Sequence, residues 1–406
     1  MSERDAGRSE ATLVELGPLG LDDGGEVLLA WRLRALPVDA HVRVVGTRAD
    51  LGLQARPWCR ALGHTLLGSD AAGFELRKGS VFAARWRDAL DTGGVDPRRD
   101  GAIAEQASPS WGLAARGARV EAGCAPLHFP WARREEVWAD EAPGLYAQAA
   151  AAQWDPARAI PWDTALVHDD AIEDAVVQVM TYLIENETAA LLVPARFLAQ
   201  IHPHFREVLQ VLAVQCADEA RHIEVFTRRA ALRHGALGSS SAGGQASLRT
   251  LVEEPDFAIA SFLLAVLGEG SFLSLLWFLE AHGPDPITRT IAKLAAQDEA
   301  RHVAFGLAHL QRHLAADPTL ADRLAAAVHR RHDALAHTAG LNADVFEALV
   351  VLAAGSLTPQ AIARGHAEVQ ALVHDMDRGR QRRLTRLGFA PAAAAALSEL
   401  HTRNFM

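Results

Sequence analysis

Apolar positions in the second part of the chain recur with the spacing of an amphipathic helix. From residue 164 onward they return every three or four residues almost without interruption, and no stretch alternates as a strand would. The pattern predicts four long helices, over 168–200, 203–234, 257–281 and 287–314, with further helices filling 318–400. This part of the chain is therefore expected to be mainly α.

The connections between the four predicted helices differ in length. The first and second helices are joined by QIHPHF, and the third and fourth by AHGPDPIT, both short enough for antiparallel hairpins. A Gly- and Ser-rich stretch of about twenty residues separates the two hairpins. Two helical hairpins joined by one long crossover is the connectivity of a ferritin-like four-helix bundle. We expect such a bundle, with extra C-terminal helices.

The amino-terminal part of the chain has a different pattern. Residues 12–80 mix short β-branched runs such as HVRVVG with helical patterns such as EVLLAWRLRAL, which predicts a small two-layer α/β domain. Residues 81–110 are rich in Gly, Pro, Asp and Ser, which is typical of a linker. Residues 111–163 are rich in Trp and turn formers and predict an irregular segment leading into the helical domain, 164–406.

Composition indicates which partners and which cellular location to expect. Half of the 406 residues are hydrophobic, and the net charge of −10 argues against nucleic acid or an anionic membrane as a partner. The three cysteines are far apart and form no CxxC pair, so we expect a reducing, cytoplasmic location. The longest apolar run carries Glu269 at its middle, which favours a buried core helix over a membrane span.

The pentapeptide DEARH occurs twice, once on the second helix of each predicted hairpin. Because residues three apart share a helix face, Glu219 with His222, and Glu299 with His302, can each direct a carboxylate and an imidazole at one point. A single E-x-x-H is more often a solvated Glu beside an ordinary histidine. Two copies on equivalent helices indicate a shared dinuclear metal centre, which requires one further Glu from each remaining helix.

Both remaining helices offer a suitable carboxylate. Glu269 lies in an otherwise apolar run, where an unpaired charge would be costly and metal ligation would remove that cost. The first helix offers Glu185 and Glu187. On a helical wheel Glu187 shares the apolar stripe with Leu183, whereas Glu185 falls on the polar side, so Glu187 is the predicted ligand.

Four carboxylates and two imidazoles around one bundle centre are typical of a site for two iron ions, or for one iron and one manganese. The predicted ligands are Glu187, Glu219, His222, Glu269, Glu299 and His302. Asp218 and Asp298 are expected to anchor the second ring nitrogen of the imidazoles. Arg221 and Arg301 either neutralise these aspartates or form exposed ion pairs.

This constellation resembles the ferritin-like di-iron carboxylate oxygenase superfamily over residues 165–310. The superfamily includes monooxygenases, N-oxygenases and acyl desaturases. Aminoarene N-oxygenases of similar layout carry an additional His one turn before the last Glu, where this chain has Ala295. Multicomponent hydrocarbon monooxygenases usually carry a Thr four residues after the third Glu, where this chain has Leu273. The resemblance implies dioxygen chemistry at two iron ions and assigns no subtype.

The leading interpretation is an enzyme that activates dioxygen to oxidise a small organic substrate in an apolar pocket beside Glu187 and Glu269. The pocket residues predicted on the third helix are Phe262, Val266, Leu273 and Trp277. No nucleotide-binding loop occurs in the sequence, so a separate ferredoxin or reductase is expected as electron donor. Ferroxidase or iron storage, a radical-generating subunit and a non-catalytic metal-binding module are the alternatives, and a homodimer is left open.

The amino-terminal domain resembles small sulfur-carrier proteins of the TusA kind over residues 17–80. The segment around Cys59 carries the C-x-x-x-G-H core of that family. Family members bear a persulfide-forming Cys soon after an LDxxG turn, but here LDDGG is followed by EVLLAW, which contains no Cys. A persulfide needs a thiolate, so we expect a docking or packing module in which Cys59 is a packed side chain.

Overall fold

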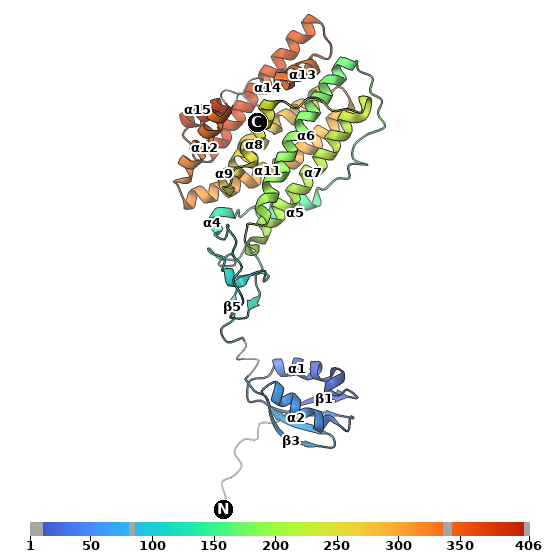
Figure 1. Ribbon diagram of the computed structural model, residues 1–406, viewed down its shortest axis with the longest axis vertical. Helices are drawn as coiled ribbons and strands as arrows, with labels where there is room; N and C mark the ends of the chain where they lie inside the picture. The colour runs from blue at the N-terminus through green and yellow to red at the C-terminus, as the bar shows by residue number, and fades with distance from the viewer. Residues whose placement is uncertain (1–10, 81–85, 336–342, 402–406) are drawn as a thin grey trace, which may run out of the picture. The chain divides into compact units, whose positions relative to one another are not determined.

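The computed structural model describes residues 11–80, 86–335 and 343–401 (Figure 1). The chain divides into two units, residues 1–91 with 118–125, and residues 92–117 with 126–406. Each unit has its own hydrophobic core, and each is described by itself.

The first unit is a two-layer α/β structure, as predicted. Its elements in chain order are β1 (Thr12–Gly17), η1 (Leu21–Gly25), α1 (Glu26–Arg34), β2 (His41–Gly46), α2 (Leu51–Ala61), β3 (Thr65–Asp70) and β4 (Gly73–Arg77), followed by a two-stranded pair, β5 (Leu90–Asp91) and β6 (Arg119–Val120). The four-stranded sheet has the order β1-β2-β4-β3, with β1 parallel to β2 and the other neighbours antiparallel. Alternate strand residues such as Val42 and Val44 are buried, and one core joins the sheet to both helices.

Cys59 belongs to that core. Its side chain lies on the buried face of α2, and burial raises the pKa of its thiol to about 11. The thiol is therefore a packed group, as expected from the sequence. The resemblance of the unit to sulfur carriers stays a prediction.

The second unit is helical. The elements before the bundle are η2 (Pro109–Trp111), α4 (Arg134–Val137) and α5 (Ala142–Ala151). The first hairpin consists of α6 (Asp170–Leu198), η3 (Pro203–Phe205) and α7 (Arg206–His234). The second hairpin consists of α9 (Phe257–Ser261), η4 (Phe262–Glu269), α10 (Gly270–His282) and α11 (Pro286–Ala316). Helix α6 packs along α7 (Figure 1). Helix α10 packs along α11. The hairpins and their connectivity agree with the predicted bundle.

Local sequence explains where these helices begin and end. Asp285 accepts a hydrogen bond from the Thr288 N–H at 2.8 Å, and Pro286 occupies the first turn of α11, both of which favour a helix start. Helix α7 ends at Gly235, whose φ of 65° lies in the left-handed region that glycine tolerates best.

The crossover between the hairpins is not the open loop that its Gly and Ser content suggests. It contains a helix, α8 (Ala242–Val252), which packs on α6. Ser241 accepts a hydrogen bond from the Gly244 N–H at 2.9 Å and starts the helix, and Leu248 and Leu251 are its buried apolar side chains. The composition of the crossover obscured this short amphipathic pattern.

A buried network of ion pairs links three helices at one end of the bundle. Arg229 on α7 donates to both carboxylate oxygens of Glu173 on α6, at 2.8 and 2.9 Å, and to Asp285 at the start of α11, at 2.7 Å. All three side chains are buried. The network joins three helices and helps to set their register.

Within 320–335 and 343–401, which the structure describes, four further helices follow the bundle, as predicted for 318–400. They are α12 (Leu320–Leu335), α13 (Ala343–Ala354), α14 (Pro359–Arg386) and α15 (Pro391–His401). Helix α13 packs against α6, and α14 packs along α10. The extension therefore covers two helices of the bundle.

Within the described residues one helical stretch, Phe257–His282, is long and apolar enough to cross a membrane. Its most apolar window is 83% buried inside the structure. Helices α13 and α14 pass the same test only as a pair bent by 117°. A helix that is apolar on all sides and covered by protein is typical of a bundle core.

Candidate metal centre

Six buried carboxylate and imidazole side chains converge inside the bundle. They are Glu187 from α6, Glu219 and His222 from α7, Glu269 at the end of η4, and Glu299 and His302 from α11. None is more than 4% exposed. They are the six residues that the sequence singles out as metal ligands.

These side chains form two overlapping groups. Glu187 and His222 belong to one group, Glu269 and His302 to the other, and the remaining pair, Glu219 and Glu299, belongs to both. Within each group the candidate ligand atoms all lie within 4.8 Å of one another. Two adjacent cations sharing two carboxylates would fit this arrangement.

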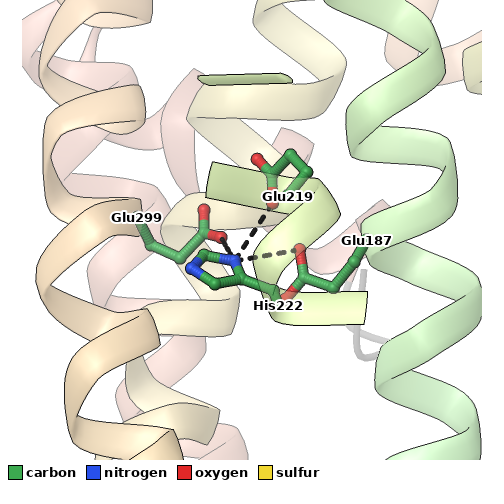
Figure 2. A group of neighbouring side chains, drawn as sticks. All are labelled: Glu187, Glu219, His222 and Glu299. Atoms are coloured by element: carbon green, nitrogen blue, oxygen red, sulfur yellow. Dashed lines mark hydrogen bonds and ion pairs between the residues drawn. The ribbon is translucent and has the colours of Figure 1, made fainter. Parts of the chain in front are cut away.

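Figure 2 shows the first group. Nδ1 of His222 lies 3.2 Å from Glu219 Oε2, 3.4 Å from Glu299 Oε1 and 3.7 Å from Glu187 Oε2. In the second group Nδ1 of His302 lies 3.1 Å from Glu219 Oε1 and 3.3 Å from Glu299 Oε2. The two shared carboxylates therefore lie between the two imidazoles.

Glu187 and Glu269 each have a buried carboxylate oxygen that accepts no hydrogen bond from any residue that the structure describes. These atoms are Glu187 Oε1 and Glu269 Oε2. A buried carboxylate oxygen without a partner is costly, and a cation would remove that cost. A donor set of carboxylate oxygens and imidazole nitrogens suits iron or manganese. The residues therefore fit a dinuclear metal site.

The pKa values differ between the carboxylates. Burial and repulsion by the shared glutamates raise the pKa of Glu187 well above its usual value, and burial with Glu299 does the same to the pKa of Glu269. Burial also acts to raise the pKa of Glu219, but the neighbouring imidazoles outweigh it, and the result is a lowered pKa. Divalent cations would compete with protons here.

The aspartates of the two DEARH motifs anchor the imidazoles in a crossed arrangement. Nε2 of His222 lies 3.2 Å from Asp298 Oδ2, and Nε2 of His302 lies 3.3 Å from Asp218 Oδ2. Each histidine therefore pairs with the aspartate of the other motif. The sequence predicts that these aspartates contact the ligand imidazoles but not which aspartate contacts which histidine.

The two motif arginines both contact these aspartates. Arg221 donates to Asp218 Oδ1 at 2.5 Å and to Asp298 Oδ2 at 2.8 Å, and its side chain is buried. Arg301 donates to the other oxygen of Asp298. Of the two interpretations left open by the sequence, the structure places Arg221 as a buried counter-ion that links the two motifs.

Three further side chains contact the centre and were not identified from the sequence. Gln215 Nε2 donates to Glu269 Oε1 at 2.9 Å, Gln153 Nε2 donates to Asp218 at 2.8 Å, and Trp154 Nε1 donates to Asp298 at 2.8 Å. Gln215 lies one turn before the first motif, so the helical pattern could have indicated it. Gln153 and Trp154 follow α5 in irregular backbone, where no periodicity marks them.

A narrow apolar cavity adjoins the second group. It is lined by Val193, Pro194, Phe197, Leu212, Gln215, Phe257, Ser261, Leu264, Ala265, His302 and Phe305. Its volume is about 20 Å³, which is room for a molecule of the size of water.

The four pocket residues predicted on the third helix lie elsewhere. Phe262 and Val266 are buried in the core, Leu273 is half-buried, and Trp277 is 44% exposed. None of them lines the narrow cavity beside His302. The lining residues Phe257, Ser261 and Ala265 are spaced four residues apart and share one helix face, whereas Phe262 and Val266 each follow a lining residue by one position and face away from the cavity.

No protein-family model matches the chain, and no curated protein matches it.

Several solved structures show a partial likeness to this chain. A Synechococcus protein with aldehyde deformylating oxidase activity is 18% identical, with 56% of this chain and 96% of that chain covered and a TM-score of 0.41. The R2-like ligand-binding oxidase from Sulfolobus acidocaldarius is 17% identical, with 62% and 93% covered and a TM-score of 0.40. A variant R2-like ligand-binding oxidase with a reconstituted Mn/Fe cofactor is 15% identical, with 61% and 94% covered and a TM-score of 0.40. Likeness at this level does not assign the chain to a family.

Proposed function

We propose that the protein is a non-haem iron oxidase or oxygenase that uses dioxygen to oxidise a small organic molecule. The observation that carries this proposal is the pair of buried groups that share Glu219 and Glu299. Such a donor set can hold two adjacent ions, with iron in both positions or iron and manganese. Bound iron would supply the one-electron and dioxygen chemistry that protein side chains lack.

The roles of the side chains follow from their contacts. Glu187 and His222 would hold one ion, Glu269 and His302 the other, and Glu219 and Glu299 both. Asp298 and Asp218 orient the imidazoles by contacting the ring nitrogens that face away from the shared carboxylates. Gln215 fixes Glu269 by donating to Oε1.

The apolar cavity supports an oxidation shielded from bulk water. Its walls are mostly Phe, Leu, Val and Ala side chains, and His302 forms part of them, so a molecule inside would lie against the metal centre. Exclusion of water protects reactive species from side reactions. An organic substrate requires movement of lining side chains such as Phe197 or Phe305, because the cavity holds only a water-sized molecule.

That small volume also favours a second candidate function, a ferroxidase. Such an enzyme needs to admit dioxygen and ferrous iron but no organic molecule. The same six ligands would serve it. The two candidates differ in what is oxidised.

The electron donor and the location are part of the proposal. An oxygenase reaction consumes electrons, and we assign their delivery to a separate ferredoxin or reductase. Cys59, Cys124 and Cys216 are free thiols, which supports the cytoplasmic location expected from the sequence.

Anaerobic loading with ferrous iron, followed by rapid mixing with oxygenated buffer, tests the function. Absorbance transients and total oxygen consumption are recorded with and without a series of small aliphatic and aromatic compounds, with a chemical reductant present. For an oxidase or oxygenase we expect at least one compound to accelerate decay of the transient and to raise oxygen consumption above that of a control with iron and reductant but no compound. Decay and consumption that match this control for every compound contradict this proposal and support the ferroxidase.

A further inference from the structure

The helix that carries Glu269 winds more widely just before that residue. The N–H of Gly270 donates to the Ala265 carbonyl, a step of five residues, before α10 resumes the ordinary step of four. When a helix returns from the wider to the narrower step, one backbone carbonyl receives no N–H from the helix itself. Here that carbonyl belongs to Val266, the residue after Ala265.

A side chain from the C-terminal extension meets that carbonyl. Nε of Arg383 on α14 donates to the Val266 carbonyl oxygen at 2.6 Å, and Nη2 lies 3.4 Å from Ser271 Oγ. Ser271 Oγ donates in turn to the Leu267 carbonyl at 2.7 Å. A guanidinium and a hydroxyl therefore bind the carbonyls of two successive residues in the wide turn.

A second arginine supports the first. Nη1 of Arg380 donates to Ser271 Oγ at 3.1 Å, and its Nε donates to Ser398 Oγ on α15, also at 3.1 Å. Ser398 donates to Asp377 on α14 at 2.6 Å. Helices α14 and α15 are thus both connected to the turn that follows Glu269.

These arginines are costly to bury. Burial lowers the pKa of Arg383 to about 9 and that of Arg380 to about 10. Packing of α14 on α10 alone would be served better by apolar side chains. Gly270 makes room for the contact, because a Cβ there would lie 2.4 Å from Arg383 Nε.

We propose that Arg383, supported by Arg380, is a positioning residue for Glu269. By binding the free carbonyl of the wide turn, it fixes the backbone from which this carboxylate reaches the metal centre. The inference rests on the dinuclear site of the proposed function. It gives the C-terminal extension a part in assembling that site.

Metal binding by the purified full chain tests this proposal. Anaerobic titration with cobalt(II) alone, followed by visible absorbance, measures the two binding steps without catalysis. In Arg383→Met we expect one of the two steps to weaken by about 10- to 100-fold, as is usual when a group that orients a ligand is removed. Arg383→Lys retains one donor and should recover part of the affinity. Arg378→Met is the matched control, because Arg378 is an exposed arginine on the same helix.

Gly270→Ala provides a second, independent variant. It keeps the arginine but places a methyl group where Arg383 Nε lies, and alanine favours a helix more than glycine does. We expect the same weakened step. Gly270→Ala decides the question alone if Arg383→Met does not fold.

Two results would overturn the inference: unchanged binding in both variants, or an equal loss in Arg378→Met. A wild-type chain that binds two cobalt ions but never oxidises an organic compound contradicts the proposed function and leaves the positioning role intact. A wild-type chain that binds no metal contradicts both.

Discussion

His222 on α7 is anchored by Asp298 on α11, with 3.2 Å between Nε2 and Oδ2. The reciprocal contact joins His302 to Asp218. Because each contact crosses from one motif helix to the other, the aspartates orient the imidazoles and hold the two helices together at the level of the metal centre. The duplicated motif thus forms one interlocked site rather than two adjacent copies.

Removing a carboxylate shared by both groups should release more bound metal than removing one that belongs to a single group. Glu219 and Glu299 lie in both groups, whereas Glu187 lies in one. We expect Glu219→Ala and Glu299→Ala to lose nearly all bound metal, and Glu187→Ala to retain about one of the two ions. Elemental analysis of anaerobically loaded protein measures this.

Glu185→Ala is the control for that series. Glu185 is a neighbour of Glu187 on α6 but lines a surface cavity with residues of α8. The Glu185→Ala variant should retain the full metal content. Equal metal content in all four variants would rule out the assigned ligand set.

The crossed contacts of the two aspartates predict which metal ion each aspartate variant binds more weakly. Asp298→Asn should weaken the ion held by His222, and Asp218→Asn the ion held by His302, each by about 10- to 100-fold. An amide can still contact the imidazole but does not hold it as a carboxylate does. Competition with a chromophoric chelator gives the affinities. Asp333→Asn, at a mostly exposed aspartate, should change neither.

The thiols should differ in their dependence on pH. Burial raises the pKa of both Cys59 and Cys216 to about 11, whereas Cys124 is exposed. Only the thiolate reacts with iodoacetamide, so alkylation of Cys59 and Cys216 should be slow at neutral pH and accelerate as the pH rises towards 11. Peptide mass spectrometry follows each site. Stoichiometric persulfide on Cys59 would contradict the packed role assigned to it.

The buried network at Arg229 should contribute strongly to stability. Arg229→Met leaves Glu173 and Asp285 without their guanidinium partner, which should lower the free energy of unfolding by about 3–5 kcal/mol. Arg233→Met is the comparison, because its ion pair with Asp170 is partly exposed, at 29% for the arginine and 76% for the aspartate, and should contribute about 1 kcal/mol or less. Urea denaturation followed by circular dichroism measures both. A loss in Arg229→Met no larger than in Arg233→Met would contradict the prediction.

The sequence by itself determined the elements that depend on spacing along one helix. Residues three apart share a helix face, so the spacing alone pairs Glu219 with His222 and Glu299 with His302. The same reasoning chose Glu187 over Glu185, and an isolated charge in an apolar run indicated Glu269. All of these inferences use local geometry, which the sequence pattern records directly.

Tertiary structure alone decided the contacts between distant parts of the chain. Nothing in the sequence shows that Asp298 meets His222, that Trp154 meets Asp298, or that Arg383 binds a carbonyl in η4. Which face of the third helix lines the cavity was also decided by the helices packed against it. Such contacts depend on how helices are packed and rotated against one another, and periodicity within a single helix carries no information about either.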